Sequence, residues 1–104
     1  MESFAVVWSE SAGPVRAGKL VLETGALRFE GPGDGAPFVH RVYYEDIESV
    51  FVGRGNGDRL AGRPALVLDR AVGGRLRIAS VNGVGVLTEL ASRLGRLTAT
   101  SLAV

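Results

Sequence analysis

The feature that most constrains the fold is a change of hydrophobic period near residue 83. Before this point, apolar residues form short segments that often alternate with polar residues, as in β-strands with one buried face. After it, apolar residues recur at three- and four-residue spacing, which is typical of an amphipathic α-helix. The order of these segments predicts a mainly β domain that ends in one helix.

The clearest alternation lies in residues 19–30, which we interpret as a hairpin. Leu27 and Phe29 are predicted to point inward, and Arg28 and Glu30 outward. Glycine and proline mark the turns between further short apolar segments. The strand over 38–44 has mixed faces, so its pattern does not indicate the buried side. Seven strands are predicted, roughly over residues 4–8, 19–23, 26–30, 38–44, 49–53, 64–69 and 75–79.

The helix is predicted roughly over residues 83–97. Glu89 and Arg93 form an i,i+4 pair in the favourable order on its polar face. Residues 98–104 are predicted to be a frayed tail. The apolar stripe consists of Val86, Leu87, Leu90, Ala91, Leu94 and Leu97.

The 104 residues suit one domain with one hydrophobic core, so residues 1–104 are interpreted as a single unit. A net charge of +1 gives no reason to expect a nucleic-acid partner. The absence of cysteine excludes disulfides and thiolate metal sites.

The N-terminal apolar run is too short for a secretion signal, and no segment reaches the roughly 18 apolar residues of a membrane helix. We expect a cytoplasmic protein. Its arginine-rich, lysine-poor composition is typical of a GC-rich bacterial genome.

Two stretches resemble a known family. Residues 18–29 (GKLVLETGALRF) resemble the G-x-L-x-L-T, then L-x-F, hairpin of GRAM and bacterial pleckstrin-homology domains. Residues 44–50 (YEDIESV) resemble the motif that follows this hairpin in the same families. In that motif an aromatic residue or Pro comes first, an acidic residue and Ile follow, and Ser-Val ends it. The resemblance implies the pleckstrin-homology-like (PH-like) superfold, a bent antiparallel sheet or partly open barrel with a helix at one end.

The acidic stretch after the fourth predicted strand is a candidate metal site. Glu45, Asp46 and Glu48 could hold a hard cation, but the sequence lacks the Asp-x-Asp-x-Asp-Gly spacing of a calcium loop. We therefore interpret them as solvated turn charges, with Ile47 and Val50 pointing inward. No metal or other cofactor is predicted.

Catalytic and phosphate-binding motifs receive little support. His40 is the only histidine, and it lies in a predicted strand, although a small hydrolase or isomerase that uses His40 with a distant carboxylate stays an alternative. Residues 53–62 (GRGNGDRLAG) form a glycine-rich loop that we expect to be polar and mobile. A strand rather than a helix follows it, which disfavours a phosphate-binding loop.

Six basic residues are candidates for surface binding. PH-like domains that bind phosphoinositides usually carry several basic residues around the first hairpin. This chain has only three basic residues in that region, and the acidic residues Glu10 and Glu23 lie among them in the sequence. Three more lie in or next to the glycine-rich loop. The candidates are Arg16, Lys19, Arg28, Arg54, Arg59 and Arg63.

A binding groove could also be lined by aromatic side chains, although core packing is favoured for them. A free sheet edge offers another route, because it can receive a strand from another chain. The predicted function is a non-enzymatic PH-like module for protein interaction or self-association. The alternative is a peripheral module that binds an anionic lipid surface. The aromatic candidates are Trp8, Phe38, Tyr43, Tyr44 and Phe51.

Overall fold

The computed structural model describes residues 3–11, 13–33, 35–53, 55, 57–81 and 84–102, without the side chains of residues 84 and 97–102. The elements, in order, are β1 (Ser3–Glu10), β2 (Arg16–Leu22), β3 (Ala26–Gly31), β4 (Phe38–Tyr43), the 3₁₀ turn η1 (Tyr44–Asp46), β5 (Ile47–Gly53), β6 (Ala65–Arg70), β7 (Gly74–Ser80) and α1 (Val84–Leu102). All seven predicted strands are confirmed.

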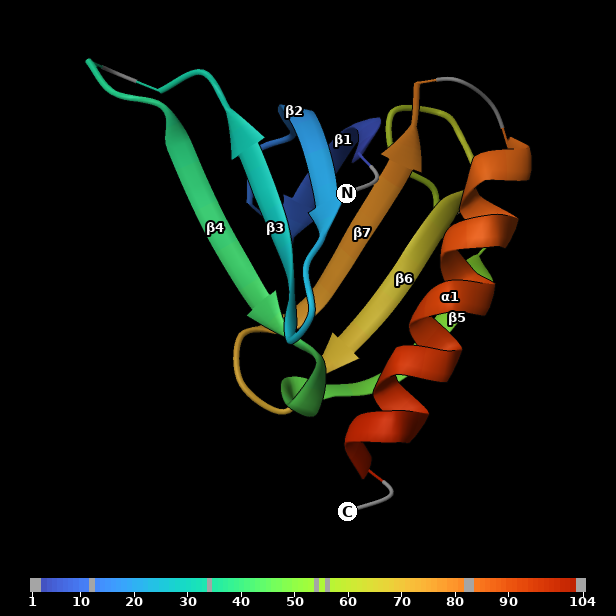
Figure 1. The fold of residues 1–104 in the computed structure, drawn as a ribbon. Coiled ribbons are helices and arrows are strands. Elements are labelled where there is room, and N and C mark those ends of the chain that lie inside the picture. The colour runs from blue at the N-terminus through green and yellow to red at the C-terminus, as the bar shows by residue number, and fades with distance from the viewer. Residues whose placement is uncertain are drawn as a thin grey trace.

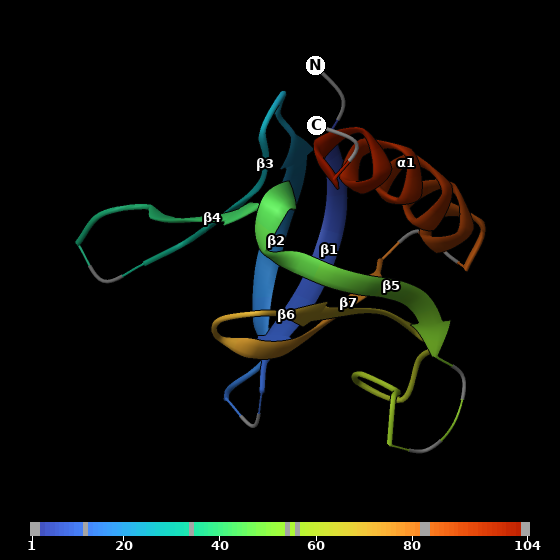
Figure 2. The same ribbon diagram turned by 90° about the horizontal axis from the view of Figure 1, so that it is seen from below.

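The strands form one antiparallel sheet in the order β4-β3-β2-β1-β7-β6-β5. The sheet curls into a half-barrel, with α1 in front of its β5–β7 half (Figure 1). Its two end strands, β4 and β5, are adjacent in the chain and joined by η1. Figure 2 shows β4 and the β3–β4 loop extending away from the rest of the molecule. The architecture confirms a mainly β fold with one C-terminal helix and is consistent with the PH-like fold.

The concave face of the sheet carries the core, as the alternation predicts. Leu27 and Phe29 are fully buried, whereas Arg28 and Glu30 lie on the convex face. Trp8 packs against Phe29 with ring centroids 4.9 Å apart. Helix α1 adds Leu87, Leu90 and Leu94, the described members of its apolar stripe that are fully buried. The core therefore joins both halves of the sheet through the helix.

The helix is longer than the sequence predicts. It begins at Val84 and continues to Leu102, so the prediction of a frayed tail from residue 98 is wrong for residues 98–102. Gly95 lowers helix propensity but leaves the helix unbroken. Leu94, the residue before Gly95, is fully buried and holds this part of the helix against the sheet. Across the described residues, the structure has no helix of the length and hydropathy needed to cross a membrane.

The turn η1 connects the two ends of the sheet. Tyr44 is 1% exposed, its backbone N–H donates to the carbonyl oxygen of Gly25 at 3.2 Å, and its hydroxyl donates to the carbonyl oxygen of Glu23 at 2.7 Å. Ile47 is buried in the core and Val50 packs against it, as predicted. The turn is thus fixed to the β2–β3 turn by Tyr44 rather than by its acidic residues.

The glycine-rich loop between β5 and β6 contains one buried apolar side chain. Leu60 packs with Ala65, Ala79 and Val7 on the convex face of the sheet. Arg77 donates a hydrogen bond of 3.1 Å to the carbonyl oxygen of Arg59 in the same loop. The described part of this loop therefore contacts the sheet and buries one leucine, which differs from the expected polar loop, whereas its mobility stays a prediction.

Candidate functional site

The basic residues of the first hairpin lie in a network of ion pairs on the convex face. Glu23 accepts hydrogen bonds from Arg28 at 2.8 Å and from Arg41 at 3.0 Å. Glu30 lies 2.8 Å from Arg28 and 3.5 Å from Lys19. The register of the strands explains this arrangement, because Lys19 pairs with Glu30 and Arg28 pairs with Arg41. Lys19 and Arg28 are therefore largely neutralised by their neighbours.

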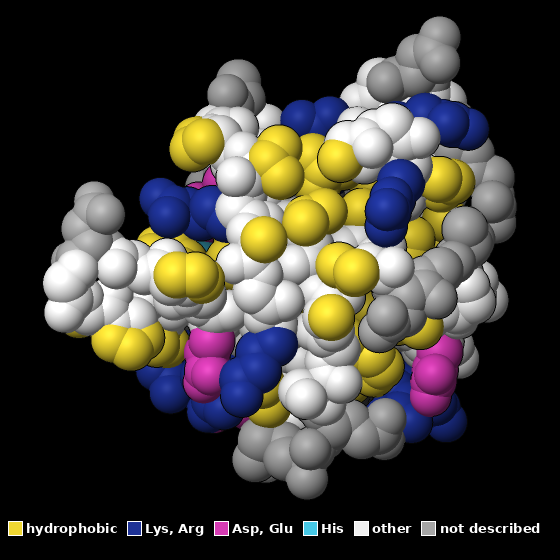
Figure 3. Space-filling model, turned by 90° about the horizontal axis from the view of Figure 1, so that it is seen from above, with side chains coloured by type: hydrophobic (Ala, Val, Ile, Leu, Met, Phe, Trp, Pro, Cys, Tyr) yellow, Lys and Arg dark blue, Asp and Glu magenta, His cyan; other side chains and the backbone are white. Residues whose placement is uncertain are grey.

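Two of the other basic candidates lie in or next to the glycine-rich loop. Arg59 and Arg63 donate to the backbone carbonyl oxygens of Gly62 and Ser80, at 3.2 and 3.0 Å. Arg54 lies outside the described residues. On the face drawn in Figure 3, Lys and Arg side chains are spread around a central group of hydrophobic side chains. The described candidates thus contribute to several separate surfaces rather than to one basic patch.

Arg16 lies apart, on the concave side of the sheet. Its guanidinium carbon is 4.3 Å from the centroid of the Phe38 ring, a cation–π contact. Phe38 in turn stacks on Trp8, with ring centroids 6.3 Å apart. These residues line a pocket of about 320 Å³, together with His40 and Glu10. Two of the predicted aromatic residues and one predicted cation therefore meet there.

His40 has a carboxylate partner in this pocket, which the sequence did not reveal. Its Nε2 atom lies 2.7 Å from Oε1 of Glu10, and the same oxygen lies 3.8 Å from the Arg70 guanidinium. No serine or threonine is among the described residues that line the pocket, so a hydroxyl nucleophile is not provided by them. The alternative of a His40-based enzyme rests on this His–Glu pair alone.

The acidic turn does not assemble a metal site in the described part of the chain. Within that part, no group of three or more His, Asp or Glu side chains is placed to hold a metal ion. Glu45 and Glu48 are exposed, as predicted for solvated turn charges. Ser49 donates a hydrogen bond of 2.9 Å to Asp69 on the neighbouring strand. The serine of the 44–50 motif therefore has a structural role.

The free edge of β4 is the second candidate site. Phe38, His40 and Val42 point to the concave side, whereas Val39 and Tyr43 point outward and are 49% and 51% exposed. This strand pairs with β3 alone, while the other end strand, β5, lies against α1. An edge strand presents unpaired backbone N–H and C=O groups to any strand that approaches it.

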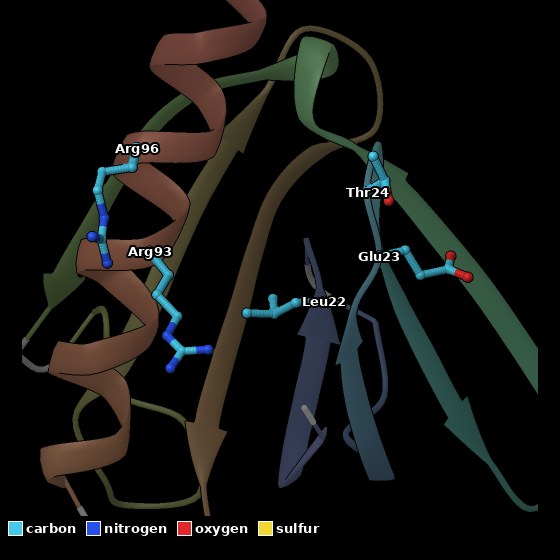
Figure 4. Close-up of a pocket in the computed structure, with 5 residues that line it drawn as sticks. All are labelled: Leu22, Glu23, Thr24, Arg93 and Arg96. Atoms are coloured by element: carbon cyan, nitrogen blue, oxygen red, sulfur yellow. The ribbon is translucent and has the colours of Figure 1, made fainter. Parts of the chain in front are cut away.

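A third candidate is a cleft between α1 and the β2–β3 turn, which we call the helix–turn cleft. It has a volume of about 430 Å³ and is lined by Leu22, Glu23 and Thr24 on one side and by Arg93 and Arg96 on the other. Figure 4 shows Arg93 extending from the helix towards Leu22, and the Glu23 carboxylate turned away from the helix. The sequence places Arg93 on the polar face of the helix and gives no signal for this cleft.

Comparison with known proteins supports the fold alone. No family model matches the chain, and no curated protein matches it. A similar solved structure is that of the C-terminal domain of an unknown protein from Leishmania infantum, with a TM-score of 0.64 and 16% sequence identity over 90% of this chain and 82% of that chain. A shared fold at this identity does not indicate a shared function.

Proposed function

We propose that the chain is a non-catalytic, PH-like interaction module that self-associates by pairing β4 with β4 of a second copy. The PH-like assignment is supported by the order of seven strands and one helix and by the two sequence stretches at residues 18–29 and 44–50. Self-association is supported by the outer face of the edge strand. The proposal predicts a two-fold dimer with a continuous sheet.

The observation that carries the proposal is the symmetry of the outward side chains of β4. Val39 and Tyr43 lie two residues on either side of Arg41, and all three are exposed. In an antiparallel pair with its two-fold axis at Arg41, each Val39 faces Tyr43 of the other copy. Pairs of a β-branched and an aromatic side chain contribute about 0.2–1 kcal/mol each. One register therefore forms two favourable pairs at once.

The charge of Arg41 at the centre of this edge is partly compensated within its own chain. The two Arg41 side chains would face each other at the axis, where like charges destabilise a pair of strands. Each Arg41 donates to Glu23 of its own chain at 3.0 Å, and Glu23 also accepts from Arg28. These contacts reduce the repulsion and leave Val39 and Tyr43 to form the apolar contacts.

Lysine substitution provides the test, because charged side chains on an edge strand oppose edge-to-edge pairing. Val39→Lys should weaken self-association measured by size-exclusion chromatography with light scattering. Val81→Lys is the matched control, because Val81 follows β7 and is 52% exposed, close to the 49% of Val39. A chain that is monomeric at every concentration, or an equal effect of both substitutions, would contradict the proposal.

The alternative, binding to an anionic lipid surface through the six basic candidates, has weaker support. Lys19 and Arg28 lie in ion pairs, and the described basic residues of the glycine-rich loop donate to backbone carbonyl groups. Co-sedimentation with anionic vesicles tests it, because an electrostatic contact weakens as salt rises. Binding at low salt that disappears in Arg16→Gln would favour the alternative.

A further inference from the structure

The helix–turn cleft is lined by one acidic and two basic side chains among the described residues. Among the described residues that line it, Glu23 is the one acidic residue. Both carboxylate oxygens of Glu23 accept hydrogen bonds from arginines on the convex face, Oε2 from Arg28 at 2.8 Å and Oε1 from Arg41 at 3.0 Å. These two arginines compensate its charge. The helix side of the cleft presents the guanidinium groups of Arg93, which pairs with Glu89 at 2.9 Å, and of Arg96.

The hydrogen bond from Tyr44 keeps this arrangement in place. The buried Tyr44 hydroxyl donates to the backbone carbonyl oxygen of Glu23 at 2.7 Å and fixes the start of the β2–β3 turn. Arg28 and Arg41 hold the Glu23 side chain, and Figure 4 shows its carboxylate turned away from the helix. The hydroxyl-bearing Thr24 then completes the rim of the cleft on the side of the turn.

The cleft also has an apolar wall. Leu22 is half-buried, packs against the core and lines the cleft opposite the helix. Arg93 extends towards it from α1 (Figure 4). A ligand that enters the cleft can therefore place an apolar group on Leu22 while a charged group meets the helix.

The donor geometry favours a phosphate group. Arg93 and Arg96 are three residues apart, so their side chains emerge from neighbouring turns of one side of the helix. A guanidinium has five N–H donors and binds phosphate oxygens in pairs. An arginine that already holds a carboxylate, as Arg93 holds Glu89 at 2.9 Å, can therefore also donate to a ligand. A tetrahedral phosphate has enough oxygens for two arginines at once.

We propose that the helix–turn cleft binds a phosphomonoester, with its phosphate on Arg93 and Arg96 and its apolar group on Leu22. The cleft does not include residues of the β4 edge. Its test can therefore fail or succeed without affecting the test of the proposed self-association. Two sources present this chemistry, a soluble alkyl phosphate and the headgroup of phosphatidic acid in a membrane.

The experiment has one arm for each source. Hexyl phosphate is titrated into the full chain by isothermal calorimetry, with hexanoate as the carboxylate comparison. Vesicles of phosphatidylcholine with and without phosphatidic acid are then tested by co-sedimentation. Binding of hexyl phosphate indicates a soluble ligand, and binding to phosphatidic acid vesicles alone indicates a membrane ligand. Binding in neither arm, or equal binding of hexanoate, would overturn the proposal.

Variants locate the binding in the cleft. Arg93→Gln and Arg96→Gln should each lower affinity about tenfold or more, because each removes charge-assisted hydrogen bonds to the phosphate. Arg16→Gln makes the same change of charge in the separate Phe38 pocket and should leave affinity unchanged. Glu89→Gln breaks the ion pair of Arg93 but keeps the arginine, so its affinity should be equal or higher. A loss in either control as large as in Arg93→Gln would contradict a specific contact.

Discussion

The hydroxyl of Tyr44 donates a 2.7 Å hydrogen bond to the carbonyl oxygen of Glu23 and so joins the link between β4 and β5 to the β2–β3 turn. Tyr44→Phe removes this donor and leaves a part-buried carbonyl oxygen without it. We expect the free energy of unfolding to fall by about 1–2 kcal/mol in urea denaturation. Tyr43→Phe is the neighbouring control, since Tyr43 is exposed, and should change stability by less than about 0.5 kcal/mol. Equal effects would show that this hydrogen bond does not stabilise the fold.

The same tyrosine predicts a loss of stability at high pH. Burial, with a further contribution from the charge of Glu23, raises the pKa of Tyr44 from 10.0 to about 12. Between these values the folded chain keeps the proton and the unfolded chain releases it, so stability falls as pH rises from 10 to 12 by up to about 1.4 kcal/mol per pH unit. The difference in unfolding free energy between the wild type and Tyr44→Phe should therefore shrink over this range. A constant difference would contradict the raised pKa.

Asp69 predicts a smaller effect at low pH. Hydrogen bonds from Arg75, and then from Ser49, lower the pKa of its carboxyl group. A lowered pKa stabilises the fold above the unfolded value of about 4, and this contribution disappears as pH falls through the folded value. Because the Asp69 side chain is partly exposed to solvent, which screens its ion pair, Asp69→Asn should cost less than about 1 kcal/mol at pH 7. The cost should decrease towards zero in unfolding measurements near pH 2, whereas a cost independent of pH would indicate a steric cause.

The close approach of β2 and β3 predicts that Gly18 cannot be replaced. A Cβ atom at this position would lie 1.9 Å from the carbonyl oxygen of Glu30, so the two strands would have to separate. Gly18→Ala should destabilise the chain by about 1–3 kcal/mol or more. Gly25→Ala is the control in the adjacent turn, because a Cβ there has no neighbour within 4 Å. Thermal unfolding of both variants checks the prediction, and equal melting temperatures would contradict it.

Local periodicity predicts those parts of the fold in which one face is consistently apolar. Leu27 and Phe29 alternate with Arg28 and Glu30, and the structure buries the first pair as expected. In β4 the rule fails, because His40 points inward and Val39 points outward. His40 lies inward where Glu10, from a distant strand, accompanies it. No local pattern contains that information.

The sites show the same limit more strongly. Arg16 was a candidate on the grounds of charge, but its stacking on Phe38 depends on strands that are distant in sequence. The glycine-rich loop contains a single leucine, Leu60, whose burial depends on Ala65 and Ala79 across the convex face. The helix–turn cleft exists only because α1 returns beside the β2–β3 turn. Sequence periodicity locates the elements, and tertiary contacts decide which residues meet.

Disulfide trapping tests the central claim, self-association through β4, most directly. The chain has no cysteine, so any disulfide in the experiment must join two introduced cysteines. Val39→Cys is mixed with a mass-tagged Tyr43→Cys under mild oxidation. Residues directly opposite on antiparallel strands have Cβ atoms about 4.5–5.5 Å apart, near the range a disulfide needs. The account predicts that the mixed 39–43 disulfide exceeds its statistical share of the products. A mixture of Val39→Cys with Val81→Cys should show no such excess. Statistical or absent cross-linking between positions 39 and 43 would contradict the proposed pairing.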